Sequence, residues 1–297
     1  MSDATNAALC ALIRPLATRP GFVDTRLPGV QVLSWDHYVA SSPQIYEPSL
    51  MILAQGRKLA RLGPRTLEYG AGHYLVQALS VPFLCETFAT KEAPLLGVAV
   101  AIDPLVLGEL VQSMDLPADR AIRAQTPESM TSVALAPAMG ESVERLLRCL
   151  HDEQDCRVLG SARLREVLYM ALKGDQASAL RALVEQQGAF ARIAASLTHL
   201  RTHYAEALTI DELASRANMS QSTFHEHFKR TTLLSPMQYL KRVRLLKAQQ
   251  MLMGEGLGVA QVAHRVGYQS ASQFSREYKR HFARPPTDES PYRPLPA

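Results

Sequence analysis

The spacing of hydrophobic residues changes near residue 103, and the chain divides there into two regimes. Between Gly21 and Asp103, short runs that are apolar or alternate between apolar and polar are separated by Pro and Gly. These intervals are typical of an all-β sandwich or small barrel. The runs that we expect to form strands span residues 31–35, 49–53, 73–76 and 83–88.

After residue 103 the apolar positions recur at helical spacing. Asp103 followed by Pro104 is typical of a helix start, because Asp can cap the first turn and Pro fits into it. Further helices are predicted over residues 141–151, 157–172, 176–187 and 190–204. One helical stripe could form a dimer interface, although an intradomain helix gives the same pattern. It consists of Val143, Leu146, Leu147 and Leu150.

The last third of the chain contains an internal repeat. Residues 209–218 correspond to residues 258–267 at an offset of 49, and residues 224–230 correspond to residues 274–280 at an offset of 50. Each copy predicts a short helix, a tight turn and a second helix that is anchored by two aromatic residues at positions i and i+4. Two copies indicate a duplicated helix-turn-helix rather than a solenoid.

The outer face of the second helix in each copy is short, polar and basic, which suits the reading of base edges in the major groove. A solvated surface is the ordinary interpretation of one such helix, but the matching second copy favours DNA binding. Basic residues and helix N-caps beside these faces are suited to phosphates. The candidate base-contacting residues are Gln221, Ser222, His225, Glu226, Ser272, Gln273, Ser275 and Arg276. The candidate phosphate-contacting residues are Ser220, Lys229, Arg230, Lys241, Arg244, Ser270, Lys279 and Arg280.

Between the two copies, Ser235 and Pro236 begin a long helix that is predicted over residues 237–253. A basic stripe on this helix includes Lys241, Arg244 and Lys247. At 1.5 Å per residue the helix would be about 25 Å long. It could therefore hold the two recognition helices in neighbouring segments of the major groove.

Charge points to the same part of the chain. The 297 residues carry a formal net charge of +4, which divides into −3 for residues 1–190 and +7 for residues 191–297. A polyanionic partner is therefore expected in the C-terminal third. The chain shows no signal-peptide pattern, no CxxC pair and no apolar run long enough for a membrane, so we expect a cytoplasmic protein without a membrane partner.

Three segments of the C-terminal third resemble the AraC/XylS family of bacterial transcription regulators. They are residues 235–245, which contain Ser-Pro-x-x-Tyr, and residues 262–268 and 273–282. The resemblance implies promoter DNA and RNA polymerase as partners, and it places base reading on residues already named and on Ala271. Leu233 and Ala283 stand where the family often has Gly, and the tail at residues 284–288 lacks the usual spacing. Because a left-handed helix end costs Leu and Ala more than Gly, we expect these corners to be built differently.

The first regime resembles the N-terminal domain of AraC-type regulators. The resemblance implies a cupin-like β-barrel, linker helices, effector sensing and dimer formation. The matching runs are residues 46–50, 55–58, 62–63 and 74–76, followed by Pro82.

Aromatic residues of the first regime could wall a pocket for an unknown small-molecule effector, or they could simply be barrel core. The candidate pocket residues are Trp35, Tyr46, Tyr74, Cys85 and Phe88. Cys85 is either an inert core residue or a thiol that reacts with an electrophile such as an aldehyde.

An enzyme is the alternative interpretation, since many barrels of this kind hold a metal. Residues 21–103 contain only His37 and His73, without an HxH arrangement, so we expect no metal, no cofactor and no catalytic residue. A cupin-type enzyme with an accessory DNA-binding domain stays the alternative.

The prediction is an α+β chain with a cupin-like barrel, linker helices and an all-α domain of two helix-turn-helix motifs. We expect a homodimeric, sequence-specific DNA-binding regulator, an activator, whose DNA binding depends on a signal sensed in the barrel. The predicted divisions are an N-terminal helical arm at 1–20, the sensor barrel at 21–103, a linker and dimerisation region at 104–190 and the DNA-binding domain at 191–297.

Overall fold

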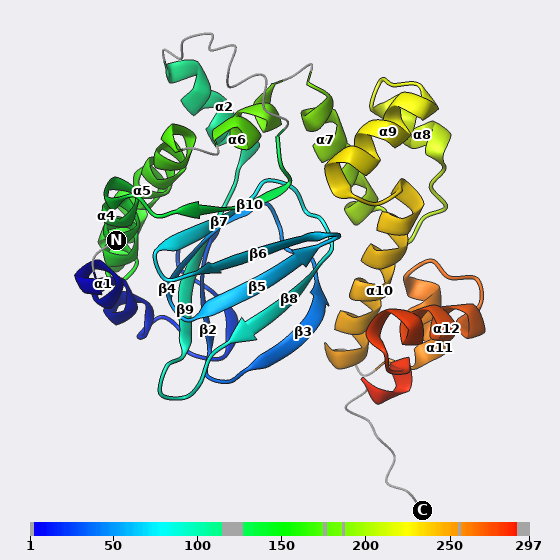
Figure 1. Ribbon diagram of the computed structural model, residues 1–297, viewed down its shortest axis with the longest axis horizontal. Coiled ribbons are helices and arrows are strands. Elements are labelled where there is room, and N and C mark those ends of the chain that lie inside the picture. Colours follow the sequence, from blue (N-terminus) through cyan, green and yellow to red (C-terminus); the bar gives the residue numbers. More distant parts are fainter. Residues whose placement is uncertain (1–2, 115–126, 175–176, 186–187, 255–256, 290–297) are drawn as a thin grey trace, which may run out of the picture. The chain divides into compact units, whose positions relative to one another are not determined.

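The computed structural model describes residues 3–114, 127–174, 177–185, 188–254 and 257–289 (Figure 1). Two compact units are present. The first runs through residue 191, apart from residues 42–45 and 81–83, which group with residues 192–297 in the second.

Two antiparallel sheets form the centre of the first unit, as the spacing of its apolar residues predicted. The larger sheet has six strands in the order β1-β2-β9-β4-β7-β10, and the smaller has four in the order β3-β8-β5-β6. They face each other, with the Tyr69 hydroxyl 3.6 Å from the Met51 sulfur (Figure 1). The strands of the six-stranded sheet are β1 (Gly21–Asp24), β2 (Val30–Trp35), β9 (Leu95–Ala101), β4 (Ser49–Gln55), β7 (His73–Gln77) and β10 (Met130–Ala134). Those of the four-stranded sheet are β3 (Val39–Gln44), β8 (Phe83–Phe88), β5 (Arg57–Leu62) and β6 (Arg65–Gly70).

The edge strand β10 lies beyond residue 103, where only helices were expected. Its residues pair antiparallel with β7, with Ser132 opposite Leu75. The strand is five residues long and sits between helical segments, so its period of two is too short to stand out from the helical pattern.

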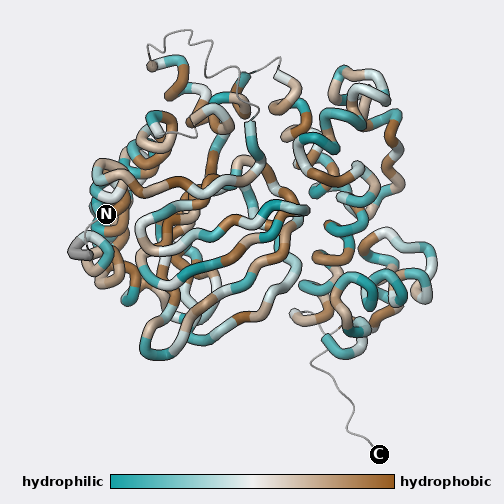
Figure 2. Tube along the Cα trace, viewed as in Figure 1, coloured by the Kyte–Doolittle hydropathy of each residue, from teal (hydrophilic) through white to brown (hydrophobic). Residues whose placement is uncertain are grey.

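Helices cover one face of the six-stranded sheet (Figure 1). Alternate residues of β4, such as Leu50 and Ile52, pack into the core beneath the helices, whereas Met51 and Leu53 are buried toward the other sheet. A strand that is buried on both faces reads as a continuous apolar run, and Figure 2 shows this hydrophobic colouring. The helices are α1 (Asp3–Ile13), α2 (Pro104–Ser113), α4 (Pro137–Cys149), α5 (Glu153–Lys173) and α6 (Ala177–Val184).

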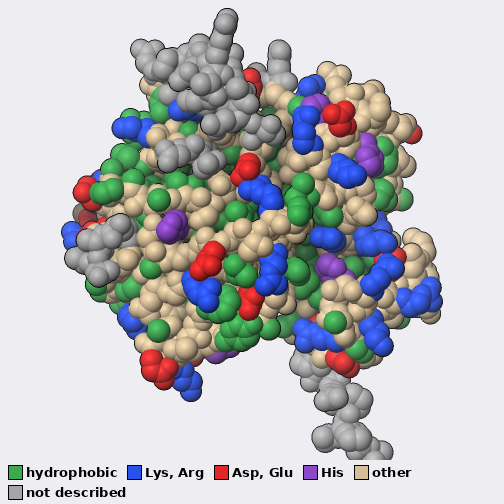
Figure 3. Space-filling view, in the orientation of Figure 1, with side chains coloured by type: hydrophobic (Ala, Val, Ile, Leu, Met, Phe, Trp, Pro, Cys, Tyr) green, Lys and Arg blue, Asp and Glu red, His purple; other side chains and the backbone are tan. Residues whose placement is uncertain are grey.

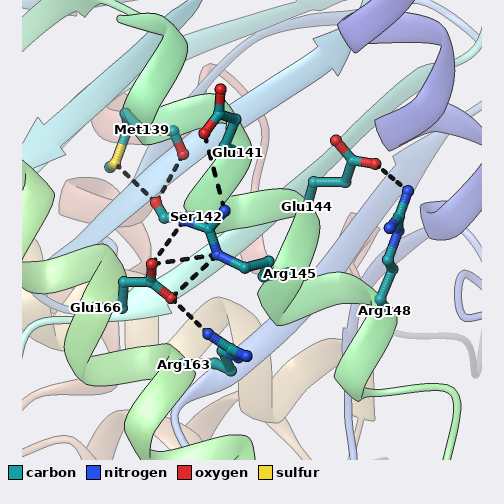
Figure 4. Close-up of polar contacts among 8 residues, drawn as sticks. All are labelled: Met139, Glu141, Ser142, Glu144, Arg145, Arg148, Arg163 and Glu166. Carbon is teal, nitrogen blue, oxygen red and sulfur yellow. Dashed lines mark hydrogen bonds and ion pairs between the residues drawn. The ribbon is translucent and has the colours of Figure 1, made fainter.

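The α4 stripe that was considered for a dimer interface lies inside this core. Its four residues are at most 1% exposed. On the opposite side of α4, Arg145 pairs with Glu166 of α5 at 2.6 Å and with Glu141 at 3.8 Å (Figure 4). The intradomain alternative therefore accounts for the stripe, which comprises Val143, Leu146, Leu147 and Leu150.

Within the described residues from 189 onward, the secondary structure is helical, with the order that the repeat predicted (Figure 1). Asp103, which precedes α2, also behaves as predicted, because its side chain accepts a hydrogen bond from the Leu105 amide. No helix in the described parts of the chain is both long and apolar enough to cross a bilayer. The remaining helices are α7 (Ala189–Thr202), α8 (Ile210–Arg216), α9 (Gln221–Thr232), α10 (Pro236–Gly254), α11 (Val259–Arg265), α12 (Ala271–Phe282) and the 3₁₀ turn Pro286–Asp288.

Candidate functional site

The first helix-turn-helix consists of α8 and α9, and local hydrogen bonds define its ends. Thr209 and Glu212 form a capping box at the start of α8. Asn218 makes the turn with a left-handed φ of 51°, which Asn tolerates better than most residues. The Ser220 side chain then accepts from the Thr223 amide and begins α9, as its position predicted.

The second motif, α11 and α12, repeats this plan with different residues. Gly258 precedes α11 without a side-chain cap, and Gly267 makes the turn at a φ of 86°. The Ser270 side chain accepts from the Gln273 amide at the start of α12. Both motifs therefore place their second helix after a left-handed residue and a serine cap.

Aromatic pairs anchor both recognition helices in the same way. Ring centroids lie 5.5 Å apart for Phe224 and Phe228 in α9, and also for Phe274 and Tyr278 in α12. All four rings are fully buried. Phe228 also meets Tyr239 of α10 edge-on at 5.7 Å. The inner faces are thus fixed, and the opposite faces of α9 and α12 point to solvent.

The candidate base-contacting residues lie on these outer faces. All eight are exposed except Ser275, which is half-buried and donates to the Ala271 carbonyl within its own helix. Gln221 donates to the Asp211 carboxylate, and Glu226 forms an ion pair with Arg230 at 3.8 Å. The structure records no partner for Arg276 among the described residues. Arg276 is therefore the long cationic side chain best placed to reach a base edge.

Two of the candidate phosphate-contacting residues on α10 already have partners within the protein. Lys241 pairs with Glu277 of α12 at 2.9 Å, and the other carboxylate oxygen of Glu277 accepts from the Tyr268 hydroxyl at 2.8 Å. Burial raises the pKa of Glu277, but the hydrogen bonds from Lys241 and Tyr268 outweigh this effect and leave that pKa below its usual value. Arg244 donates to the carbonyls of Tyr204 and Glu206 at 2.7 and 2.8 Å. Arg244 therefore braces the loop before α8 against α10.

The other candidate cations remain at the surface. Lys229, Arg230, Lys279 and Arg280 are all exposed, at the distal ends of α9 and α12. Blue Lys and Arg side chains recur over the helices of the second unit in Figure 3. The hydroxyls of Ser220 and Ser270 serve as helix caps.

The corners after α9 and α12 keep the left-handed conformation, contrary to the expectation from their residue types. Leu233 has a φ of 61° and Ala283 a φ of 60°. The Leu233 amide still donates to the Lys229 carbonyl at 2.8 Å. The backbone geometry that Gly normally provides is thus retained, at a conformational cost of about 1 kcal/mol per residue.

Contacts from the C-terminal segment further stabilise the second motif. The nearly buried Glu289 carboxylate accepts from the Tyr278 hydroxyl at 3.1 Å and from the Gln249 amide at 2.9 Å. Arg284 pairs with the same carboxylate at 2.7 Å. The unusual tail therefore ties α12 to α10, a role that its sequence did not reveal.

In the first unit, the structure brings together only part of the expected pocket. Trp35, Tyr46 and Cys85 lie close to one another around Lys58, a residue that the sequence analysis missed. The Lys58 ammonium is 3.8 Å from the Trp35 ring centroid and 3.5 Å from the Tyr46 hydroxyl. The Tyr46 hydroxyl is in turn 3.9 Å from the Cys85 sulfur. The sequence pattern that could have identified Lys58 is its position in β5, where buried residues alternate with more exposed ones and Lys58 falls on the buried side.

Tyr74 and Phe88 lie elsewhere, so their assignment to this pocket is wrong. Tyr74 belongs to the core under the helices, on the opposite face of the six-stranded sheet from Met51. The Phe88 ring contacts Tyr38 and lies 3.7 Å beneath the Arg57 guanidinium. Side-chain alternation assigns a strand residue to one of two faces, but the sequence does not say which face is the barrel interior.

Burial changes the titration of the Lys58 cluster. It lowers the pKa of Lys58 to about 8, against an opposing effect of Cys85. Burial also raises the pKa of Tyr46 and Tyr69 well above the usual phenol value. Both phenols are therefore neutral at physiological pH.

The candidate metal ligands of the enzyme alternative are dispersed. His37 and His73 are both exposed, and His37 contacts Asp36 at 2.7 Å. Within the described residues, no three His, Cys, Asp or Glu side chains gather in a way that could hold a metal ion.

Comparison with known proteins agrees with this architecture. Residues 26–179 match the family model of the AraC-type transcriptional regulator N-terminus, and residues 213–289 match a helix-turn-helix domain. The HTH-type transcriptional activator RhaS of Escherichia coli is 30% identical over 149 residues, which are 50% of this chain and 53% of RhaS. The chain thus spans about half the length of the curated relatives it matches.

Solved structures of similar fold include ToxT from Vibrio cholerae. ToxT with a bound unsaturated fatty acid superposes with a TM-score of 0.59 at 9% identity, over 91% of this chain and 95% of ToxT. Another ToxT crystal structure gives a TM-score of 0.57 at 10% identity, over 87% of this chain and 96% of ToxT. At such identities the likeness shows the fold. Because the N-terminal family model covers more than half of its residues, the chain belongs to the AraC-type transcriptional regulators.

Proposed function

We propose that the protein is a sequence-specific DNA-binding transcriptional regulator, an activator, whose binding to promoter DNA is controlled by a small molecule or other signal sensed in the N-terminal barrel. The observation that carries this proposal is the pair of matched recognition helices. Both expose short polar and basic side chains on one face and bury paired aromatic rings on the other.

The comparisons support the finer parts of the proposal. RhaS is named as a transcriptional activator, and ToxT has been crystallised with a fatty acid, which supports an effector of small-molecule size. The proposal also includes RNA polymerase as a partner, a homodimeric state and a cytoplasmic location, where the DNA lies. The α4 stripe is buried, so the proposed dimer requires another surface.

Binding of the purified protein to its own upstream DNA tests the proposal. We expect the affinity to fall steeply with salt, because phosphate contacts release counterions. Arg276→Ala should weaken binding by about 1–3 kcal/mol and relax the preference at one base pair. Lys279→Ala should weaken binding to all sequences alike and reduce the salt slope by about one.

Arg157→Ala is the matched control, because Arg157 is an exposed arginine of α5 in the first unit. It should leave DNA binding unchanged. An Arg276→Ala variant with unaltered affinity and sequence preference would contradict the placement of α12 in the major groove. Absence of salt-dependent binding by the wild-type protein would contradict the function itself.

A further inference from the structure

Lys58 is a buried amine that neither the fold nor DNA binding explains. It lies in β5 opposite Tyr69 and Thr87 of the neighbouring strands, and it is 1% exposed. Lysines are almost never this buried unless they form an ion pair. Among the described residues, no carboxylate lies within ion-pair distance of its ammonium, which instead faces aromatic rings and the Tyr46 hydroxyl.

The surroundings of Lys58 are those of a reactive amine rather than a structural one. Burial without a counter-charge favours the neutral form, and it lowers the pKa to about 8. At pH 7 about a tenth of such amines are neutral, against about one in 2,500 for an ordinary lysine. Desolvated lysines of this kind are the ones that form Schiff bases with carbonyl compounds.

We propose that Lys58 is a covalent capture site for small aldehydes, with the Tyr46 hydroxyl as a positioning group. The proposal rests on the proposed function, in that the resulting adduct would be the signal sensed in the barrel. The aldehyde carbon forms a bond to Nζ, and the carbonyl oxygen leaves as water. From the ammonium form, the aldehyde and Lys–NH₃⁺ give a protonated imine and one water, so no proton is gained or lost overall and no oxidant is required.

The surroundings of Lys58 suit both the departure of the oxygen and the charge of the imine product. The protonated imine keeps the positive charge at Nζ, so the Trp35, Tyr46 and Phe22 rings that surround the ammonium at 3.8, 5.8 and 5.9 Å would also stabilise the product. The neutral Tyr46 hydroxyl accepts from Nζ at 3.5 Å and donates to the Cys85 sulfur at 3.9 Å, and by turning from the sulfur it can donate a hydrogen bond to the departing oxygen. Lys58 is 1% exposed behind rings that are half-buried, so the bulk water that hydrolyses imines has little access to Nζ.

Reductive trapping tests the proposal on the full-length protein. Propanal and sodium cyanoborohydride at pH 7 should leave a propyl group on Lys58, located by peptide mass mapping. Lys173 is the internal comparator, because it is an exposed lysine that also lies over a tyrosine ring, at 5.5 Å. We expect Lys58 to be labelled about tenfold faster than Lys173, and its rate to rise with pH and level off above about 8.

Three variants and one unfolded control separate the roles. Lys58→Arg keeps a cation but should abolish the adduct at this position, and Tyr46→Phe keeps the ring but should slow labelling of Lys58 alone. In urea, Lys58 and Lys173 should react at the same rate, because only the folded environment distinguishes them. Cys85→Ser should retain labelling of Lys58 at a rate no lower than wild type, because Cys85 acts to raise the pKa of Lys58.

Labelling of Lys58 no faster than Lys173 in the folded protein would overturn the proposal. So would loss of propanal uptake in Cys85→Ser with uptake retained in Lys58→Arg, which would assign the chemistry to the thiol. Binding of wild-type protein to its upstream DNA, with and without propanal, is measured separately. A labelled Lys58 in a protein that does not bind DNA would refute the proposed function while leaving the capture site standing.

Discussion

The two helix-turn-helix motifs have the same outline, but different forces hold them in shape. The first is defined largely by local signals, with a capping box at Thr209 and Glu212 and an asparagine at its turn. The second lacks a side-chain cap on α11 and relies on contacts from distant segments. These include the Lys241–Glu277 pair and the Glu289 carboxylate.

This difference indicates how a duplicated unit can diverge without losing its geometry. Aromatic anchors and a serine cap on the recognition helix are common to both copies. What surrounds those shared features differs, because α10 contacts both motifs whereas the C-terminal tail ties only the second motif to α10. The second motif should therefore be the more sensitive to changes made far from it in sequence.

Substitution of the turn residues Gly267 and Asn218 should give the largest difference in stability between the two motifs. A Cβ at Gly267 would lie 2.5 Å from the Ala205 carbonyl oxygen, at a backbone φ that L-residues rarely adopt. Gly267→Ala should destabilise the chain by about 3 kcal/mol, whereas Asn218→Ala should cost about 1 kcal/mol. Urea unfolding gives the magnitudes, and hydrogen exchange over residues 259–282 locates the effect. Equal costs at the two turns would show that contact with the loop before α8 does not matter.

Removing the charge of Glu289 should have the next largest effect. Glu289→Gln weakens three interactions of a nearly buried carboxylate, with Tyr278, Gln249 and Arg284. We expect a loss of about 2 kcal/mol, with faster hydrogen exchange in α12 than in α9. Glu226→Gln is the control, since its exposed pair with Arg230 should contribute less than about 0.5 kcal/mol. A Glu289→Gln protein as stable as that control would show that the C-terminal tail does not stabilise the second motif.

Loss of the capping box tests the first motif in the same way. Thr209→Ala removes the oxygen that accepts from the Glu212 amide, and it should cost about 1 kcal/mol. The matched change in the second motif is Gly258→Ala, which removes no side-chain cap. Ala is a poorer N-cap than Gly, but it also restricts the unfolded chain, so the net cost should be only a few tenths of a kcal/mol. Thermal denaturation of both variants measures the contrast. If the two changes cost the same, the first motif does not depend on its local cap.

The left-handed corners should give the smallest effect, and the same one in both motifs. Leu233→Gly and Ala283→Gly each relieve a strained φ near 60°, and we expect a gain of about 0.5 kcal/mol after the added freedom of the unfolded glycine. Melting temperatures of the two single variants measure this. Destabilisation by either change would mean that its side chain contributes packing that outweighs the strain.

Much of the fold follows from the sequence because it is encoded locally. The strand runs around residues 49–53 and 83–88, the cap at Asp103 and the repeat that ends at residue 280 all depend on spacing within one element. A period of two or of 3.6 residues states which side of an element is buried. The exposed faces of α9 and α12 were predicted on that basis, and their contacts with bases remain a prediction.

What periodicity does not encode is the identity of the partner on the buried side. Tyr74 and Cys85 both alternate within apolar strands, yet they face different cores because the six-stranded sheet is covered on both faces. Similarly, Lys241 and Arg244 belong to one basic stripe in the sequence, but α12 and the loop before α8 engage them inside the protein.

The sequence by itself thus determined the elements, the duplication and the polar faces of the recognition helices, since each depends on neighbours along the chain. Only the tertiary structure decided that Lys58 is enclosed by Trp35 and Tyr46, that Glu289 locks α12, and that Leu233 and Ala283 stay left-handed. The physical reason is that burial of a charge and strain in a backbone are set by residues brought together from distant strands and helices.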